Sequence, residues 1–247
     1  MKTISSLCLM LLMLPLAAQN EDAKQPDLLS NQQAFLNLPE EKRAEFAKHL
    51  GEATRVFQQK RIFEALEELE KASAIFTDSP EIHNLRGSCH VEIRAFDKAL
   101  AEFEKAAALS KDNPSITFNI GEIHFVTKQW QKAHDTFQTV MSLLPPENTS
   151  LGRLVEFKIL LCKKKLGQNA EAVAMAEKYD FMDDSPYYFY SQAALAYDAK
   201  NLVKAEEWLA IANRIFRDPN ILAPWQDTLV EYGYIKSFYG EEAPEVP

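Results

Sequence analysis

Residues 80–113 read PEIHNLRGSCHVEIRAFDKALAEFEKAAALSKDN, and residues 114–147 read PSITFNIGEIHFVTKQWQKAHDTFQTVMSLLPPE. The two segments are one pattern written twice, because a shift of 34 positions brings eight identical residues into register. These are Pro80/Pro114, Ile82/Ile116, Gly87/Gly121, His90/His124, Lys98/Lys132, Ala99/Ala133, Phe103/Phe137 and Leu109/Leu143. A period of this length indicates stacked structural repeats, each of which buries its apolar face against its neighbours.

The composition favours helix throughout the repeated region. Only 7 of the 247 residues are glycine, and the abundant Ala, Leu, Glu and Lys residues are good helix formers. Apolar residues recur at spacings of three and four, as on one face of a helix. The sequence therefore predicts five helix pairs, at 39–59 with 62–76, 81–93 with 96–110, 115–127 with 130–143, 150–166 with 170–179, and 186–199 with 202–216.

Small residues are expected where the two helices of a pair cross. Gly87 with Ala99 has this role in one repeat, and Gly121 with Ala133 has it in the next. The absence of a large side chain lets the two backbones approach closely, and a phenylalanine such as Phe103 fills the space beside the crossing.

At these residues the chain resembles the tetratricopeptide repeat (TPR) family. The shared features are the 34-residue period, two antiparallel helices, a small residue in each helix, an aromatic before the second helix and a proline at the repeat boundary. The resemblance covers about residues 46–217, and it departs from the family's aromatic pattern in the first helix, where His83, His90, Thr117 and His124 stand. It implies an all-α, right-handed helical-hairpin solenoid of about five repeats with a C-terminal capping helix.

The first 18 residues have the pattern of a secretory signal peptide. Lys2 is positive, residues 7–16 are almost wholly apolar, and Ala17-Ala18 supplies small residues for cleavage. The apolar run is shorter than the ~20 residues of a membrane-spanning helix, although an uncleaved anchor stays open as an alternative. We expect an exported chain, periplasmic or secreted after cleavage near Ala18, with no transmembrane segment in the mature protein.

The remaining segments complete the predicted organisation. Residues 19–38 are polar apart from the cluster Ala34-Phe35-Leu36 and predict a linker, in which a short helix after Pro26-Asp27 stays open. Residues 39–217 form the solenoid, and 240–247 predict a disordered acidic tail. Residues 218–239 predict a capping helix, since a solenoid needs a terminal element with one polar side. Its apolar stripe is Leu222, Trp225, Leu229, Tyr232 and Ile235. The residues expected on its solvent face are Gln226, Asp227, Glu231 and Lys236.

The charge balance limits the possible partners. With 36 acidic and 27 basic residues the formal net charge is −9, so the protein repels phosphate backbones and generic nucleic-acid binding is not expected. Cys89 and Cys162 lie in non-adjacent repeats, too far apart for a disulfide, and are expected to be buried thiols. The sequence does not define an oligomeric state.

The resemblance implies that a protein or extended peptide binds along the concave surface made by the first helix of each pair. The residues that map to this surface are Asn84, Phe118, Asn119, Glu122, Phe125, Phe157, Lys158, Lys165, Tyr187, Tyr190 and Tyr197. Aromatic rings with a local basic patch suit a peptide whose apolar side chains dock on the rings and whose carboxylate meets a lysine. The alternative, that several of these rings pack between helices, stays open.

The motifs of catalysis are missing from the sequence. It contains no nucleophile elbow, no HExxH pattern, no phosphate loop and no dinucleotide fingerprint, so we expect no enzyme activity and no cofactor. A metal site or an enzyme built on His83, His90 and His124 is a less favoured alternative, since zinc needs ligands that converge at 2.0–2.3 Å.

The sequence thus predicts a non-catalytic scaffold or adaptor that binds proteins in an exported compartment. Its alternative is an accessory subunit of an envelope assembly that uses the convex face or residues 19–38.

Overall fold

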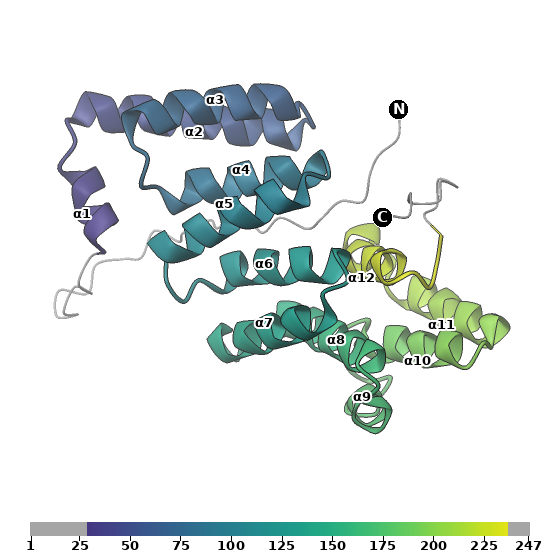
Figure 1. Ribbon diagram of the computed structural model, residues 1–247. Helices are drawn as coiled ribbons and strands as arrows, with labels where there is room; N and C mark the ends of the chain where they lie inside the picture. The colour runs from purple at the N-terminus through teal and green to yellow at the C-terminus, as the bar shows by residue number, and fades with distance from the viewer. Residues whose placement is uncertain (1–28, 237–247) are drawn as a thin grey trace. The chain divides into compact units, whose positions relative to one another are not determined.

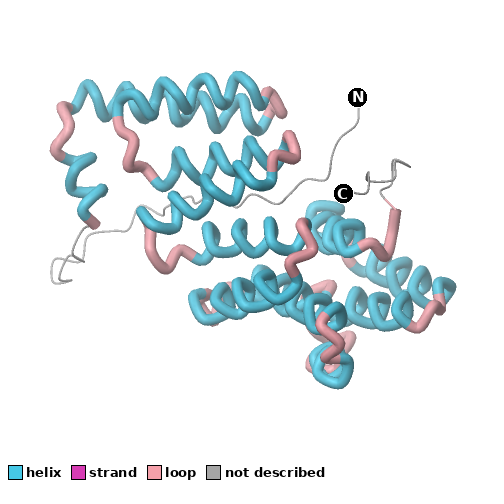
Figure 2. Tube along the Cα trace, in the orientation of Figure 1, coloured by secondary structure: helices cyan, strands magenta, loops and turns pink. Residues whose placement is uncertain are grey.

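The computed structural model describes residues 29–236 and contains twelve helices and no strand in that range (Figure 1). The helices are α1 Ser30–Leu36, α2 Glu40–Gln58, α3 Ile62–Ile75, α4 Pro80–Glu92, α5 Phe96–Leu109, α6 Pro114–Val126, α7 Trp130–Leu143, α8 Thr149–Lys165, α9 Asn169–Ala176, α10 Tyr187–Asp198, α11 Leu202–Ile215 and α12 Pro219–Tyr232. Short turns and loops join them (Figure 2). The fold is therefore an all-α helical repeat, as the sequence predicts.

The chain divides into two compact units, which we treat separately: an N-terminal unit of residues 29–116 and a C-terminal unit of residues 117–236. The boundary falls inside α6, near its start. The predicted signal peptide (1–18) and acidic tail (240–247) lie outside the described residues.

The five hairpins share one turn conformation. In each of them a residue between the two helices has a positive φ: Lys60, Arg94, Lys128, Gly167 and Lys200. These positions are separated by 34, 34, 39 and 33 residues. The spacing confirms five repeats and places the longer one across residues 144–148, where two prolines interrupt the register. Since side chains seldom adopt positive φ, its recurrence marks a requirement of the hairpin.

The first helix of the described chain, α1, packs onto the N-terminal unit. The ring of Phe35 lies 5.0 Å from that of Phe46 and 5.3 Å from that of Phe76. The Asn31 side-chain amide donates to the backbone carbonyls of Asp78 (3.2 Å) and Leu109 (3.3 Å). The part of the predicted linker that the structure describes is thus a docked helix. One aromatic and one amide hold it, which is too small a signal in a polar segment to be read from composition.

Glycine sets the helix crossing in the middle hairpins. A Cβ atom added to Gly87 would lie 2.6 Å from the ring of Phe103, and one added to Gly121 would lie 2.6 Å from the ring of Phe137. Both rings are fully buried. The expected close approach is confirmed, and its direct cause is the phenylalanine of the second helix lying over the glycine of the first.

We therefore expect Gly87→Ala to destabilise the N-terminal unit, although alanine is the better helix former. Forcing a methyl group into a filled core costs about 1–3 kcal/mol, against a gain of about 1 kcal/mol in helix propensity. The free energy of unfolding, measured by circular dichroism in urea, should fall by about 1–2 kcal/mol.

The matched control is Gly51→Ala in α2 of the same unit, where nothing lies within 4 Å of the added Cβ. Propensity alone acts there, so stability should rise by up to about 1 kcal/mol. Equal effects of the two substitutions would contradict the proposed role of the Phe103 ring.

In the C-terminal unit, α8 is the central helix. Its neighbours are α7, α9, α10 and α12, and the side chains from Leu154 to Cys162 are all buried. Even Lys158 is only 1% exposed. A helix covered on every side in this way carries apolar residues all round, which explains why α8 lacks a clear polar face.

Candidate functional site

The last described helix, α12, has well-formed ends. Its first turn is capped by the Asp218 carboxylate, which accepts a hydrogen bond from the backbone N–H of Asn220 (2.9 Å). It ends at Gly233, whose φ of 94° few other residues tolerate. The helix buries Leu222, Trp225, Thr228, Leu229 and Tyr232. Four of the five residues of the predicted apolar stripe therefore face the rest of the C-terminal unit. The fifth, Ile235, lies beyond the helix, because Gly233 ends it at Tyr232 and not at the predicted residue 239.

The surface under this stripe is formed by the first helices of three hairpins, α6, α8 and α10. We call it the inner face and define it by Phe125, Phe157, Lys158, Lys165, Tyr187, Tyr190 and Tyr197. Figure 1 shows α12, in yellow, beside the end of α6. Its Trp225 ring lies against Tyr190 of α10, with the centroids 5.6 Å apart. Of the helices, α8 is the one that α12 approaches most extensively. Helix α12 thus follows the repeats in sequence and also packs across their first helices in space.

Trp225 is the central apolar anchor of α12. Its ring centroid lies 5.4 Å from that of Phe157, 5.6 Å from that of Tyr190 and 6.5 Å from that of Tyr187. Only 4% of its surface is exposed. Aromatic pairs at such distances add about 0.5–1.5 kcal/mol each to the effect of burial, so Trp225 supplies much of the attachment.

A second aromatic contact lies two helical turns further on. The Tyr232 ring packs against Phe125 (6.3 Å) and Trp130 (5.5 Å), and the ammonium group of Lys165 lies 4.4 Å from its centroid. Beyond the helix end, Tyr234 stacks on Tyr197 (5.2 Å between centroids, 16° between planes). The contacts of residues 219–236 therefore extend from α10 to α6.

Between the two aromatic anchors lies a buried charged cluster. Lys158 Nζ is 2.9 Å from Glu122 Oε1, 3.6 Å from Glu231 Oε2 and 4.7 Å from the ring centroid of Phe125. The side chains of Lys158 and Glu122 are 2% and 6% exposed. One buried cation thus faces two carboxylates, one from α6 and one from α12, and Asp227 adds further negative charge.

Burial raises the pKa of both carboxyl groups in this cluster, because the charged form loses its hydration. The pKa of Glu231 rises to about 8, since the attraction of Lys158 is opposed by the charges of Glu122 and Asp227. Burial acts to lower the pKa of Lys158, but the two glutamates outweigh it and the pKa is raised. Near neutral pH, Glu231 is therefore mainly protonated in the folded state.

The structure places the sequence-predicted site residues in three groups. The seven that define the inner face contact the segment 219–236 or the cluster around Lys158. Phe118 packs on Phe137 of α7 (5.9 Å), Glu122 pairs with Lys158, and Asn119 is buried. Asn84 is half-buried on α4, in the N-terminal unit.

The main difference from the expectation is burial. The rings of Phe125, Phe157, Tyr187 and Tyr190 are at most 1% exposed, so in this conformation they offer no surface to a peptide in solution. Burial favours the packing alternative, yet much of the packing partner is α12. Glu231, expected on the solvent face, instead points to Lys158. The sequence signal was the pair of large aromatic residues on one side of the terminal helix, Trp225 and Tyr232, which a solvent-facing cap seldom needs.

Two of the three histidines of the N-terminal unit, His49 and His83, have carboxylate partners, whereas Nδ1 of His90 is buried without a hydrogen bond. Nδ1 of His49 lies 2.7 Å from Glu68 Oε2, and Nδ1 of His83 lies 2.7 Å from Glu102 Oε2, one repeat further along. Burial lowers the pKa of His90. Within residues 29–236, no three His, Cys, Asp or Glu side chains are placed to hold a metal ion. Because the same histidine–carboxylate pair occurs in two successive hairpins, His83 occupies a structural position of the repeat.

We expect the stability of the C-terminal unit to fall as the pH rises from about 5 to about 8. The unfolded chain loses the Glu231 proton near pH 4.5, whereas the folded chain keeps it until about pH 8. Between these values the unfolded state binds fewer protons, so the free energy of unfolding decreases with pH, by on the order of 1 kcal/mol per unit. Urea unfolding followed by tryptophan fluorescence measures this slope, because all three tryptophans lie in this unit.

Glu231→Gln should reduce that slope, because glutamine does not titrate and the only glutamate left beside Lys158 is Glu122. Glu207→Gln, on the exposed side of α11, is the control and should keep the wild-type slope. The same pH dependence in wild type and Glu231→Gln would contradict the assignment.

Comparison with known proteins establishes the fold. No family sequence model and no curated protein sequence matches the chain. Its backbone is similar to that of YrrB, a TPR protein with an unusual peptide-binding site, at 19% identity over 80% of this chain and 96% of that chain (TM-score 0.53). It is also similar to pilF of Pseudomonas aeruginosa at 16% identity over 82% and 96% (TM-score 0.55). A third is TTC0263, a thermophilic TPR protein of Thermus thermophilus, at 15% identity over 75% and 99% (TM-score 0.53).

These likenesses define the chain as a protein with the tetratricopeptide-repeat fold. No helix within residues 29–236 is both long enough and apolar enough to cross a membrane.

Proposed function

We propose that this chain is a non-catalytic scaffold or adaptor that binds a segment of another protein on the inner face of its C-terminal unit. The main support for this proposal is the way in which α12 is bound. The inner face holds a helix through two aromatic anchors, Trp225 and Tyr232, and through a buried lysine between them. A surface with this chemistry can hold an equivalent segment of a partner. YrrB, which has the same fold, is described as having a peptide-binding site.

The compartment in this proposal is exported, periplasmic or secreted. Its support is the amino-acid pattern of residues 1–18, with the charge of Lys2, the apolar run and Ala17-Ala18. The mature chain would then begin near Gln19.

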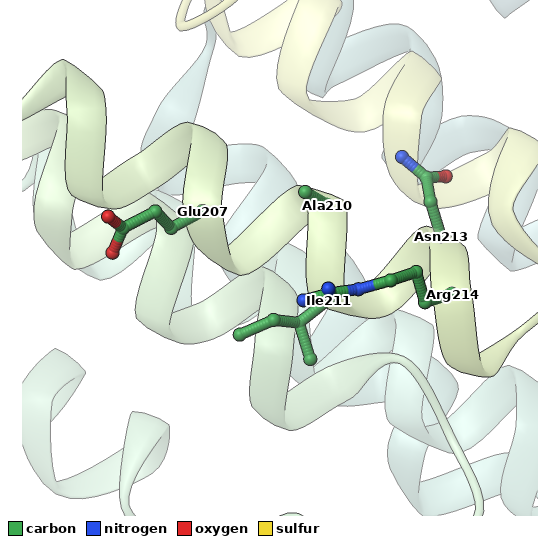
Figure 3. A pocket seen from close by; sticks show the side chains of 5 residues that line it. All are labelled: Glu207, Ala210, Ile211, Asn213 and Arg214. Carbon is green, nitrogen blue, oxygen red and sulfur yellow. The ribbon is translucent and has the colours of Figure 1, made fainter.

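A second candidate is an accessory subunit that docks through an outer face, and α11 supports it. Leu202 and Val203 of α11 are 61% and 73% exposed. An open depression of about 530 Å³ lies on the same helix, lined by Glu207, Ala210, Ile211, Asn213 and Arg214 (Figure 3). Figure 3 shows these side chains along one stretch of α11, with the Glu207 carboxylate at one end and the Arg214 side chain extending back toward Ile211.

Site-specific photo-cross-linking in cells separates the two candidates. A photoreactive amino acid replaces one exposed residue at a time: Lys165 at the edge of the inner face, Val203 on α11, or Lys105 on α5 as the control. We expect a covalent adduct with a partner protein from position 165 and none from 105. Mass spectrometry of the same adduct should show a chain that lacks residues 1–18.

An adduct from position 203 alone would favour the accessory subunit. No adduct from any of these positions would contradict a protein-binding role for the C-terminal unit, and an intact residue 1 would contradict export with cleavage.

A further inference from the structure

The position of α12 raises the question of whether it belongs to the repeat stack or occupies its binding surface. In a solenoid, each helix packs on the hairpin immediately before it. The hairpin before α12 is α10–α11, but α12 lies most extensively on α8 and its Tyr232 reaches Phe125 of α6. Leu202 and Val203 at the start of α11 and Ile215 at its end are left exposed meanwhile. This helix follows the arrangement of a bound ligand more closely than that of a sixth repeat.

The attachment of α12 also contains weak points that a permanent core helix would not need. Pro224 lies inside the helix and lacks the N–H that would bond to the preceding turn. Glu231 Oε2 is buried 3.6 Å from Lys158 Nζ, beyond hydrogen-bond distance. Glu231 competes with Glu122, which is closer to the same cation. These features lower the free energy that holds α12 in place.

The surface beneath is, by contrast, able to exist without α12. If Glu231 leaves, Lys158 keeps Glu122 as its partner at 2.9 Å, so no buried charge is left uncompensated by the departure. Departure of α12 also returns Glu231 to water and so removes the burial that raises its pKa. The rings of Phe157, Tyr187 and Tyr190 would then be open to another apolar side chain.

We propose that α12 is an internal ligand that covers the inner face and is displaced by the partner, and that the partner segment is an amphipathic helix of the same chemistry. This inference rests on the proposed binding of a partner at the inner face and adds its regulation. The partner helix carries two large aromatic residues on one side, two turns apart, as Trp225 and Tyr232 are. It carries a hydrogen-bonding or acidic residue next to the second aromatic, where Glu231 meets Lys158.

The test uses the full chain with a specific protease site inserted at Arg217-Asp218, the exposed connection between α11 and α12. The chain folds intact and is then cut, so α12 is held only by its contacts. The probe is a fluorescent synthetic peptide of residues 218–236. We expect the cut protein to stay folded by circular dichroism and to exchange its own α12 for the labelled peptide, detected by fluorescence anisotropy. The uncut protein should bind the probe at least about tenfold more weakly, because its site is filled.

Two control peptides define the chemistry. The Trp225→Ala peptide should bind roughly 100-fold more weakly, as expected for loss of a buried aromatic anchor. The Asp227→Asn peptide keeps both anchors and should bind at least as well as the wild-type peptide, since Asp227 adds to the repulsion around Glu231.

Three outcomes would overturn the proposal. Unfolding or aggregation of the cut protein would mean that α12 is part of the core. A folded cut protein that never takes up the probe would mean that α12 does not exchange. A cut or Trp225→Ala full-length protein that forms dimers in sedimentation would make a second copy of this chain the occupant. Each result is independent of the cross-linking test, which can fail for lack of a partner even where α12 exchanges.

Discussion

A single buried lysine organises the C-terminal unit. Lys158 projects from α8, the helix with the most neighbours, and its ammonium group meets a carboxylate of α6 at 2.9 Å and one of α12 at 3.6 Å. Burying a cation is costly unless it is paired, so the conformation of this unit has to bring carboxylates to that place. The ring of Phe125 lies 4.7 Å from the ammonium group, and Lys158 as a whole is only 1% exposed, so water is kept from the cluster. Glu122 gives this cation its close partner, and the aromatic contacts of Trp225 and Tyr232 hold α12 beside it.

The repeats themselves could be predicted from sequence, because their identities are packing requirements. Gly87 and Gly121 match since a phenylalanine ring lies 2.6 Å from where their Cβ atoms would stand. Helix boundaries follow from Pro80 and Pro114, which begin α4 and α6. Contacts of this kind are local, within one hairpin or between neighbours. A regular sequence period therefore carries them directly.

That these residues share one surface could be predicted as well, but that α12 covers this surface could not. The mapping of Phe125, Phe157, Lys158 and Tyr190 to one surface is a consequence of the repeat register, and the structure does bring them together. That α12 covers them depends on contacts between residues about 70–100 positions apart, such as Trp225 with Phe157 and Tyr232 with Phe125. No period in the sequence indicates such pairs. The docking of Phe35 on Phe46 and Phe76 was missed for the same reason, since one aromatic residue creates no pattern.

The terminal helix lies on the inner face with Trp225 as its anchor. The most direct measurement is nuclear Overhauser spectroscopy of the full chain in solution, with the aromatic rings assigned by single substitutions. The account predicts cross-peaks from the Trp225 indole to the rings of Phe157 and Tyr190, whose centroids lie 5.4 and 5.6 Å away. A Trp225 indole with no cross-peak to either ring, and with the emission of a solvent-exposed tryptophan, would contradict it.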